Sequence, residues 1–313
     1  MLELVSLLAF LLIAFSIGSN DTSNAFGVCI GCKIISLRKA TLILLALVLL
    51  GIFLQGERIM KTVGKDLVEL SVEISAIAML IAAVIIVSSN FRGLPVSTHQ
   101  VIIGSLMGTA VAFGAQVSFK TFLGILASWI ISPLISGIFA VTIFLFLENL
   151  LKKFSLIEAD RILKIFIFCS ATLIAYNTGA NELATAMAPV IHAKAFEPLG
   201  SAILGAFLLW LGAFLLSTRV IETVCKGITV LDPKSGLSAH LGAGIAVLGF
   251  TSIGMPVSTT YAMIGGIASV GFLKGIRAVR VETLKKIAVN WIFAITFSFA
   301  IGFLVAKAIL FIS

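Results

Sequence analysis

Apolar segments long enough to cross a membrane recur along the whole chain, and this pattern limits the fold more than any other feature of the sequence. Hydrophobic residues make up 60% of the 313 residues and charged residues only 12%, so a soluble domain could not cover its surface with polar groups. We therefore predict an all-α integral membrane protein that crosses the bilayer several times. The first apolar run has no small-residue cleavage site after it, so we predict a membrane helix and not a signal peptide.

The chain repeats itself at a constant offset of 161 residues. A polar motif and a Pro-Val-Ser-Thr stretch each occur twice at this spacing. The matches include Gly18 with Gly179, Asn20 with Asn181, Asp21 with Glu182, and residues 95–98 with residues 256–259. We predict two homologous halves, an N-terminal repeat at 1–155 and a C-terminal repeat at 156–313.

The segments 2–32 and 162–191 are too long for simple membrane spans. A continuous helix of about 30 residues would measure roughly 45 Å, against roughly 30 Å of hydrocarbon. A break at the polar motif would shorten each span, and Gly18 and Gly179 supply flexible points there. We therefore predict that both helices are broken.

The segments 74–113 and 237–273 each consist of two apolar runs that are short for a span. Each pair could form two thin spans or one re-entrant hairpin; the sequence leaves both open, and the hairpin is our expectation. Either form returns the chain to the same side, so each half crosses the membrane an odd number of times. The second half is then inverted relative to the first, with about ten membrane segments in total.

The distribution of Lys and Arg residues predicts the orientation. They are concentrated in the connections on one predicted face, such as 33–39 and 152–164, and are sparse on the other. Because positively charged loops stay in the cytoplasm, we predict that this face is cytoplasmic. The protein would then lie in the plasma membrane with both termini on its outer side. The same loops account for the net charge of +8, so we expect no nucleic-acid partner.

Inverted repeats with broken helices are typical of secondary transporters, which bind their substrate near the membrane midplane where the repeats meet. Each Pro-Val-Ser-Thr stretch is predicted to start a helix there, with the proline in the first turn. The first amides of such a helix lack intrahelical partners and carry the positive end of the dipole. Together with hydroxyl groups they predict an anion site, whose candidate residues are Ser97, Thr98, Ser258 and Thr259.

The polar motifs supply a complementary cation site. A carboxylate within a membrane segment is costly and usually marks an ion or proton pathway. Carboxylate and amide oxygens together suit Na+, while a carboxyl group alone could carry H+, so the coupling ion stays open. A bound cation would offset the charge of the anion. The candidate residues are Asn20, Asp21, Asn24, Asn181 and Glu182, and no other metal and no organic cofactor is expected.

The chain contains three histidines. His99 directly follows Thr98, which predicts a role beside the anion site. His192 and His240 are expected to be incidental.

These motifs resemble those of the inorganic phosphate transporter family, which imports phosphate with sodium ions or protons. The GANDVANA-type motif of that family is similar to GSNDTSNA at 18–25 and, more distantly, to GANELATA at 179–186. Its PVSTTH-like stretch resembles PVSTHQ at 95–100 and PVSTTY at 256–261. The resemblance covers nearly the whole chain and implies the same anion and cation roles. Two positions depart from the family pattern, Glu182 in place of aspartate and Thr185 in place of asparagine.

The expected function is import of inorganic phosphate coupled to Na+ or H+. A sulfate permease on the same scaffold is the nearest alternative. The carboxylates favour phosphate, because phosphate can donate hydrogen bonds and sulfate only accepts them. A passive anion channel and an intramembrane enzyme with Asp21 and Glu182 as paired acids are the remaining alternatives, and we expect no enzymatic activity. Phosphate, the cation and the lipid bilayer are the expected partners, and homo-oligomerisation stays open.

Overall fold

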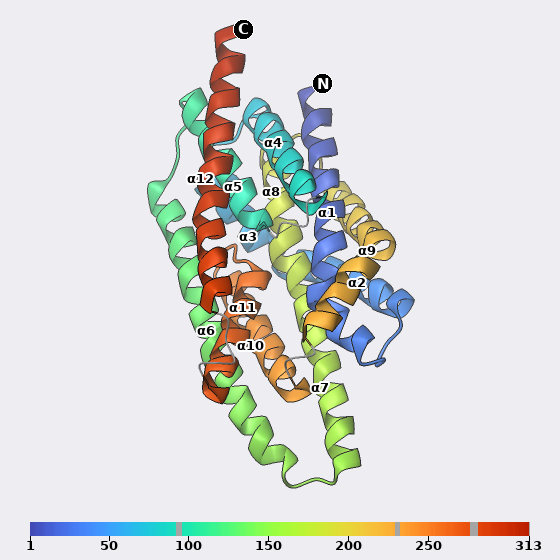
Figure 1. Ribbon diagram of the computed structural model, residues 1–313. Helices are drawn as coiled ribbons and strands as arrows, with labels where there is room; N and C mark the ends of the chain where they lie inside the picture. The colour runs from blue at the N-terminus through green and yellow to red at the C-terminus, as the bar shows by residue number, and fades with distance from the viewer. Residues whose placement is uncertain (92–95, 229–231, 276–280, 313) are drawn as a thin grey trace.

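Long helices run through most of the chain in the computed structural model (Figure 1). The structure describes the backbone of residues 1–91, 96–228, 232–275 and 281–312, and the side chains of residues 1–90, 96–216, 232–275 and 289–312. Within these ranges it contains no β-strand, only an isolated bridge between Val68 and Val117. The prediction of an all-α protein is confirmed.

The helices of the first half are α1 (Leu2–Gly31), α2 (Leu37–Gly51), α3 (Glu57–Lys61), α4 (Val72–Phe91), α5 (Thr98–Phe113) and α6 (Phe119–Leu151). The π-helical turn η1 (Ile52–Gly56) joins α2 to α3, and a second one, η2 (Thr62–Asp66), continues α3, so that Leu37–Asp66 forms one rod. The second half contains α7 (Leu156–Asn177), the π-helical turn η3 (Thr178–Leu183), α8 (Ala184–His192), α9 (Pro198–Ile228), α10 (Pro233–Ser252), α11 (Thr259–Lys274) and α12 (Val281–Ile312).

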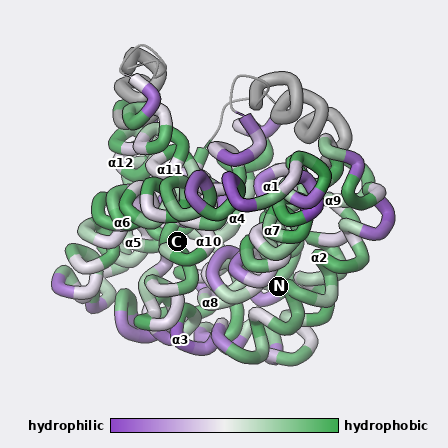
Figure 2. Tube along the Cα trace, turned by 90° about the horizontal axis from the view of Figure 1, so that it is seen from below, coloured by the Kyte–Doolittle hydropathy of each residue, from purple (hydrophilic) through white to green (hydrophobic). Residues whose placement is uncertain are grey.

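Several of these helices are long and apolar enough to cross a membrane, and Figure 2 shows hydrophobic residues along most of their length. The described residues contain 7 such segments: Leu2–Gly31, Leu37–Asp66, Val72–Asn90, Phe119–Leu151, Leu156–His192, Pro198–Leu216 and Val289–Ile312. Helix α5 is apolar but shorter. The protein is therefore a multi-pass membrane protein, while the total of about ten segments stays a prediction.

Helix α1 runs unbroken through the first polar motif, so the predicted break in the first half is wrong. Hydroxyl groups of the motif bond back to carbonyls of the preceding turn: Thr22 Oγ1 donates to Gly18 O and Ser23 Oγ donates to Asn20 O, both at 2.6 Å. Polar side chains that are satisfied in this way need no break in the helix. In the second half, the predicted break takes the milder form of the π-helical turn η3.

Glycines bring helices of the two halves into backbone contact. A Cβ atom at Gly18 would overlap the backbone of Leu209 on α9, and a Cβ atom at Gly179 would overlap the backbone of Val48 on α2. Both partners of the second contact are related to those of the first by the offset of 161 residues, so the same packing occurs twice. Close backbone approach of this kind is a main source of helix association in lipid. These glycines therefore serve packing, and not the flexibility that the sequence suggested.

Helices α4 and α5 pack against each other, as do α10 and α11. In Figure 1 the first pair lies in the upper part of the molecule and the second in the lower part, while both chain termini lie at the top. The outer end of the second pair is closed by an ion pair between Asp232, the N-cap of α10, and Lys274. Although partial burial acts in the opposite direction, hydrogen bonds from Lys274 and Ser235 lower the pKa of Asp232 to about 2.

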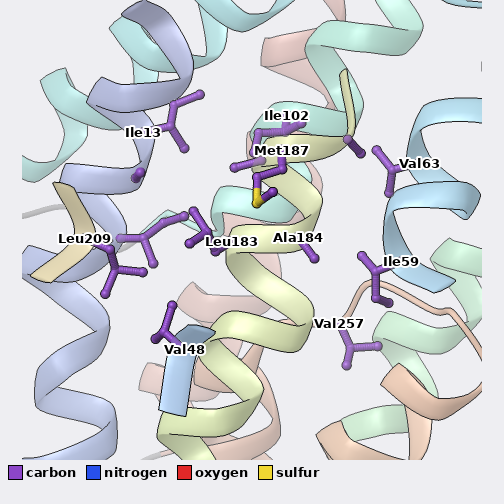
Figure 3. Close-up of a cluster of buried hydrophobic side chains, with 14 of the residues drawn as sticks. Ile13, Val48, Ile59, Val63, Ile102, Leu183, Ala184, Met187, Leu209 and Val257 are labelled. Atoms are coloured by element: carbon purple, nitrogen blue, oxygen red, sulfur yellow. The ribbon is translucent and has the colours of Figure 1, made fainter. Parts of the chain in front are cut away.

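An apolar cluster surrounds η3 and α8 and fixes the position of the second polar motif (Figure 3). Leu183, Ala184 and Met187 project from this segment and are all buried. The side chains around them come from α1, α2, α3, η2, α5 and α9 and include Ile13, Val48, Ile59, Val63, Ile102 and Leu209. Because Leu183 follows Glu182 directly, the packing of this cluster also holds the polar residues of η3 in place.

We predict that Gly51→Ala and Gly212→Ala both lower the thermal stability of the protein. A Cβ atom at either position would overlap the carbonyl oxygen of a facing helix, that of Tyr176 or Phe15 respectively. Overpacking of this kind costs about 1–3 kcal/mol. Thermal unfolding of the purified protein in detergent measures the effect.

Gly249→Ala is the matched control, because a Cβ atom there meets nothing within 4 Å and alanine is the better helix former. If all three variants melted at the temperature of the natural protein, close glycine packing would not be what holds these helices together.

Candidate functional site

The first polar motif lies on one face of α1, where Asn20, Asp21 and Asn24 are all partly buried. Asn24 Nδ2 donates to Asp21 Oδ1 at 3.0 Å and to Thr260 Oγ1, in the first turn of α11, at 3.1 Å. Asn20 Nδ2 donates to Asn90 Oδ1, near the end of α4, at 2.6 Å. Helix α1 therefore contacts the inner end of a helix from each of the two pairs.

The second polar motif is centred on Asn181, which is buried in η3. Asn181 Nδ2 donates to Thr251 Oγ1 at 2.7 Å and to Met255 O at 3.3 Å. Asn181 Oδ1 accepts from the backbone N–H of Val257 at 3.2 Å and lies 2.7 Å from His99 Nε2. One amide thus connects the end of α10, the residues before α11 and the first turn of α5.

The carboxyl groups of the two motifs meet, although they belong to different halves of the chain. The side chains of Asp21 on α1 and Glu182 on η3 lie close enough to interact with each other. Glu182 is 4% exposed, and its carboxyl group also interacts with His99. Two carboxylates this close repel each other unless a proton or a cation lies between them. The arrangement can therefore bind positive charge.

The Pro-Val-Ser-Thr stretches place two helix starts at the same region. Ser97 and Ser258 are the N-cap residues of α5 and α11, both in extended conformation, and within the described chain neither side chain caps its helix. Ser97 Oγ and Thr259 Oγ1 are buried hydroxyls without a hydrogen-bond partner among the described residues. Ser258 is buried as well, and Thr98 is partly buried. Helix-start amides and unpartnered hydroxyls together can donate hydrogen bonds to an oxyanion.

The structure thus brings together the four segments that carry the nine predicted residues. Contacts of Asn181 with His99 and Val257 set both helix starts against the second motif, and the contact of Asn24 with Thr260 sets the start of α11 against the first. The predicted place of the proline is wrong, since α11 begins at Thr259, after Pro256. The carbonyl of Pro256 instead accepts a hydrogen bond from Trp129 Nε1 at 2.7 Å. Pro95 lies outside the described residues.

Several residues of the region were not expected from the sequence. Asn90 and Thr251 bind the first asparagine of each motif, Asn20 and Asn181, and are themselves related by the offset of 161 residues. Their signal in the sequence is a polar side chain at equivalent positions before each helix start. Thr260, inside the quoted PVSTTY stretch, could have been found from the same comparison.

His240, expected to be incidental, contacts the site after all. Its Nε2 atom bonds the backbone carbonyl of Asn24, and its Nδ1 atom lies 2.9 Å from Ser170 Oγ. The imidazole is buried. It therefore contacts the backbone of α1 within the first polar motif, and the expectation that His240 is incidental is corrected.

Comparisons with known proteins agree on one family. A sequence model described as the phosphate transporter family matches residues 17–302. A Methanocaldococcus jannaschii protein whose name marks it provisionally as a phosphate permease is 34% identical over 295 residues, which is 94% of each chain. The sulfate permease CysP of Bacillus subtilis is 28% identical over 320 residues, covering 99% of this chain and 88% of its own.

A solved structure titled as the sodium-dependent phosphate transporter superposes with a TM-score of 0.82, at 25% identity and 100% coverage of both chains. The matching family and this structural neighbour are transporters and not enzymes. The resemblance drawn from the repeated motifs is confirmed: the chain belongs to the phosphate transporter family.

Proposed function

We propose that the protein is a secondary active transporter that imports inorganic phosphate across the plasma membrane together with Na+ or H+. The observation that carries this proposal is the meeting of two acidic, amide-rich motifs with two uncapped helix starts at one place. A site of this kind can hold an anion and a cation side by side. The family and the structural neighbour support phosphate as the anion.

Phosphate would bind at the starts of α5 and α11. The first amides of both helices lack intrahelical acceptors, and the positive ends of both dipoles favour an anion. Hydroxyl groups of Ser97, Thr98, Ser258 and Thr259 would complete the donor set. The buried oxygens of Ser97 and Thr259 support this role, since they lie at the two helix starts, have no described partner, and could donate to an anion bound there.

The coupling cation would bind in the adjacent acidic region formed by Asn20, Asp21, Asn24, Asn181 and Glu182. The contact between the two carboxyl groups supports this, because a cation or a proton there relieves their repulsion. The bound positive charge would also offset the charge of phosphate. Coupling then follows from electrostatics, since each ion binds better when the other is present.

The two halves would be inverted relative to each other in the membrane, with α4–α5 and α10–α11 as re-entrant hairpins. Three observations support this topology. The two pairs occupy opposite parts of the molecule, and both termini lie at one end (Figure 1). The inner ends of the two helix pairs also contact the middle of other long helices: Asn90 of α4 contacts Asn20 within α1, and Thr251 of α10 contacts Asn181 within the α7–α8 rod. The charge distribution of the loops supports an orientation in which both termini face the outside of the cell.

A second candidate substrate is sulfate, and the similarity to a sulfate permease over 99% of this chain favours it. Phosphate remains the first proposal because it can donate hydrogen bonds to Asp21 or Glu182, whereas sulfate needs an intervening cation. Uptake into proteoliposomes decides between them. Accumulation of radiolabelled phosphate, driven by an imposed sodium or proton gradient and insensitive to excess sulfate, would support the first proposal and identify the ion.

We predict that Asp21→Asn lowers gradient-driven phosphate accumulation at least about tenfold, because the variant lacks the charge that binds the cation. Uptake into proteoliposomes with and without the gradient is the measurement. Asp160→Asn is the matched control, since that carboxylate forms only an exposed ion pair with Lys164. Normal flux in Asp21→Asn would instead indicate a passive anion channel.

We predict that Ser97→Ala and Thr259→Val each raise the KM for phosphate roughly tenfold or more, since a hydrogen bond to a charged group contributes about 1.5–3 kcal/mol. Neither variant should lose thermal stability, because neither hydroxyl has a partner in the described structure.

Ser132→Ala removes another unpartnered buried hydroxyl, on α6, and should change neither KM nor stability. If Ser97→Ala and Thr259→Val left the KM for phosphate unchanged, the hydroxyls of Ser97 and Thr259 would not be part of the anion site.

A further inference from the structure

The two copies of the polar motif differ in chemistry at one position within the motif and at one position of the helix start that contacts it. Asn24 in the first copy corresponds to Thr185 in the second at the offset of 161 residues. Their partners also correspond, since Thr260 faces the first copy and His99, its counterpart, faces the second. In the first copy the larger side chain is Asn24 on the motif and the smaller is Thr260 at the helix start. In the second copy the smaller side chain, Thr185, is on the motif and the larger, His99, is at the helix start.

In the first copy, the amide groups turn their nitrogen atoms to the protein. Asn24 uses Nδ2 for Asp21 and Thr260, and Asn20 uses Nδ2 for Asn90. Their Oδ1 atoms accept no hydrogen bond from the residues that the structure describes. Two amide oxygens and the carboxylate of Asp21 therefore remain on one partly exposed face of α1, as oxygen ligands suited to a hard cation.

In the second copy, the hydroxyl of Thr185 bonds back to the carbonyl oxygen of Asn181 at 2.7 Å. The orientation of the Asn181 amide is fixed by its neighbours. The backbone N–H of Val257 can only donate, so the atom that it meets is Oδ1, and Met255 O can only accept, so its partner is Nδ2.

The tautomer of His99 follows from this orientation. Because its Nε2 atom lies 2.7 Å from Asn181 Oδ1, an acceptor, that nitrogen must carry a proton and donate it. Asn181 Oδ1 thus accepts two hydrogen bonds, which occupy both of its lone pairs. Its backbone oxygen is engaged by Thr185. No oxygen of Asn181 is left to bind a cation.

We propose that a metal cation is ligated by the first copy alone, through Asn20, Asp21 and Asn24, and that in the second copy His99 occupies the place of the cation. This inference rests on the proposed cation-coupled function and divides its acidic region into two parts. A hydrogen-bond donor and a cation compete for the same oxygen lone pairs. With His99 in this place, the second copy serves as a permanent structural contact between η3 and the starts of α5 and α11. Within this copy, Glu182 alone keeps side-chain oxygens that could ligate a cation.

The test is equilibrium binding of radioactive sodium to the purified full-length protein in saturating inorganic phosphate. We expect about one Na+ per chain for the natural protein. Asp21→Asn should lose this binding. Glu182 lies beside Asp21 but is not one of the three proposed ligands, so Glu182→Gln should still bind about one Na+ per chain, even if its affinity for Na+ and its transport rate fall. The double variant His99→Thr with Thr185→Asn restores the first-copy pattern and should bind about two Na+ per chain.

The outcome for Glu182→Gln decides the inference even if the double variant fails to fold. Two Na+ per natural chain, falling to one in Glu182→Gln, would overturn it while leaving cation coupling intact. If the natural protein bound no sodium and its uptake were driven by protons alone, neither copy would ligate a metal cation. That result would also overturn the inference, while cation coupling would stand.

Discussion

Polar groups inside a bilayer have to be satisfied by the protein itself, and the centre of this molecule is organised by that constraint. The hydroxyls of Thr22 and Ser23 bond to their own helix, which lets α1 continue through a run of polar residues. The amide of Asn181 is saturated by four neighbours from three segments. Against this background, the buried hydroxyls of Ser97 and Thr259, which lack a described partner at the two helix starts, suit the anion that we propose to bind there.

Glycine packing sorts the helices into groups, and the site lies where the groups meet. Gly18 and Gly179 join α1 to α9 and η3 to α2. Gly108 joins α5 to α12, and Gly265 joins α11 to α6, again by backbone contact. Between these groups, at the site, the contacts include side-chain hydrogen bonds such as the one from Asn24 to Thr260 and those made by Asn181. Close backbone packing therefore surrounds the region where we propose that ions bind, and side-chain hydrogen bonds lie within it.

Much of this arrangement could be predicted from the sequence, because membrane segments are long, apolar and easily counted, and because duplication doubles every signal. The repeat identified both polar motifs and both helix starts, and the structure brings them together. The continuity of α1 could not be predicted, because it depends on whether hydroxyls bond to their own helix or to a ligand. The same holds for Gly18, which the sequence suggested as a flexible point and which instead packs against Leu209.

Contacts across the site could not be predicted from the sequence either. They depend on the three-dimensional distance between side chains that no sequence motif marks. His240 gives no local sign that it bonds the backbone of Asn24. Glu182 and Thr185, by contrast, were visible as departures from the family pattern before the structure explained one of them. Thr185 is short, and His99 from the facing helix reaches the amide of Asn181.

The exchange between these facing positions has an evolutionary consequence. In an assembly of two identical single-repeat chains, every substitution appears at both copies of a site, so one copy cannot gain a histidine while the other keeps a threonine. The difference between His99 and Thr260 is therefore closed to an assembly of two identical chains and open to this protein, whose single chain carries both repeats. Tyr261 donates to Gln100 at 3.4 Å, and these residues are also equivalent positions of the two repeats. Carrying both repeats in one chain thus allows equivalent residues to differ and to pair asymmetrically.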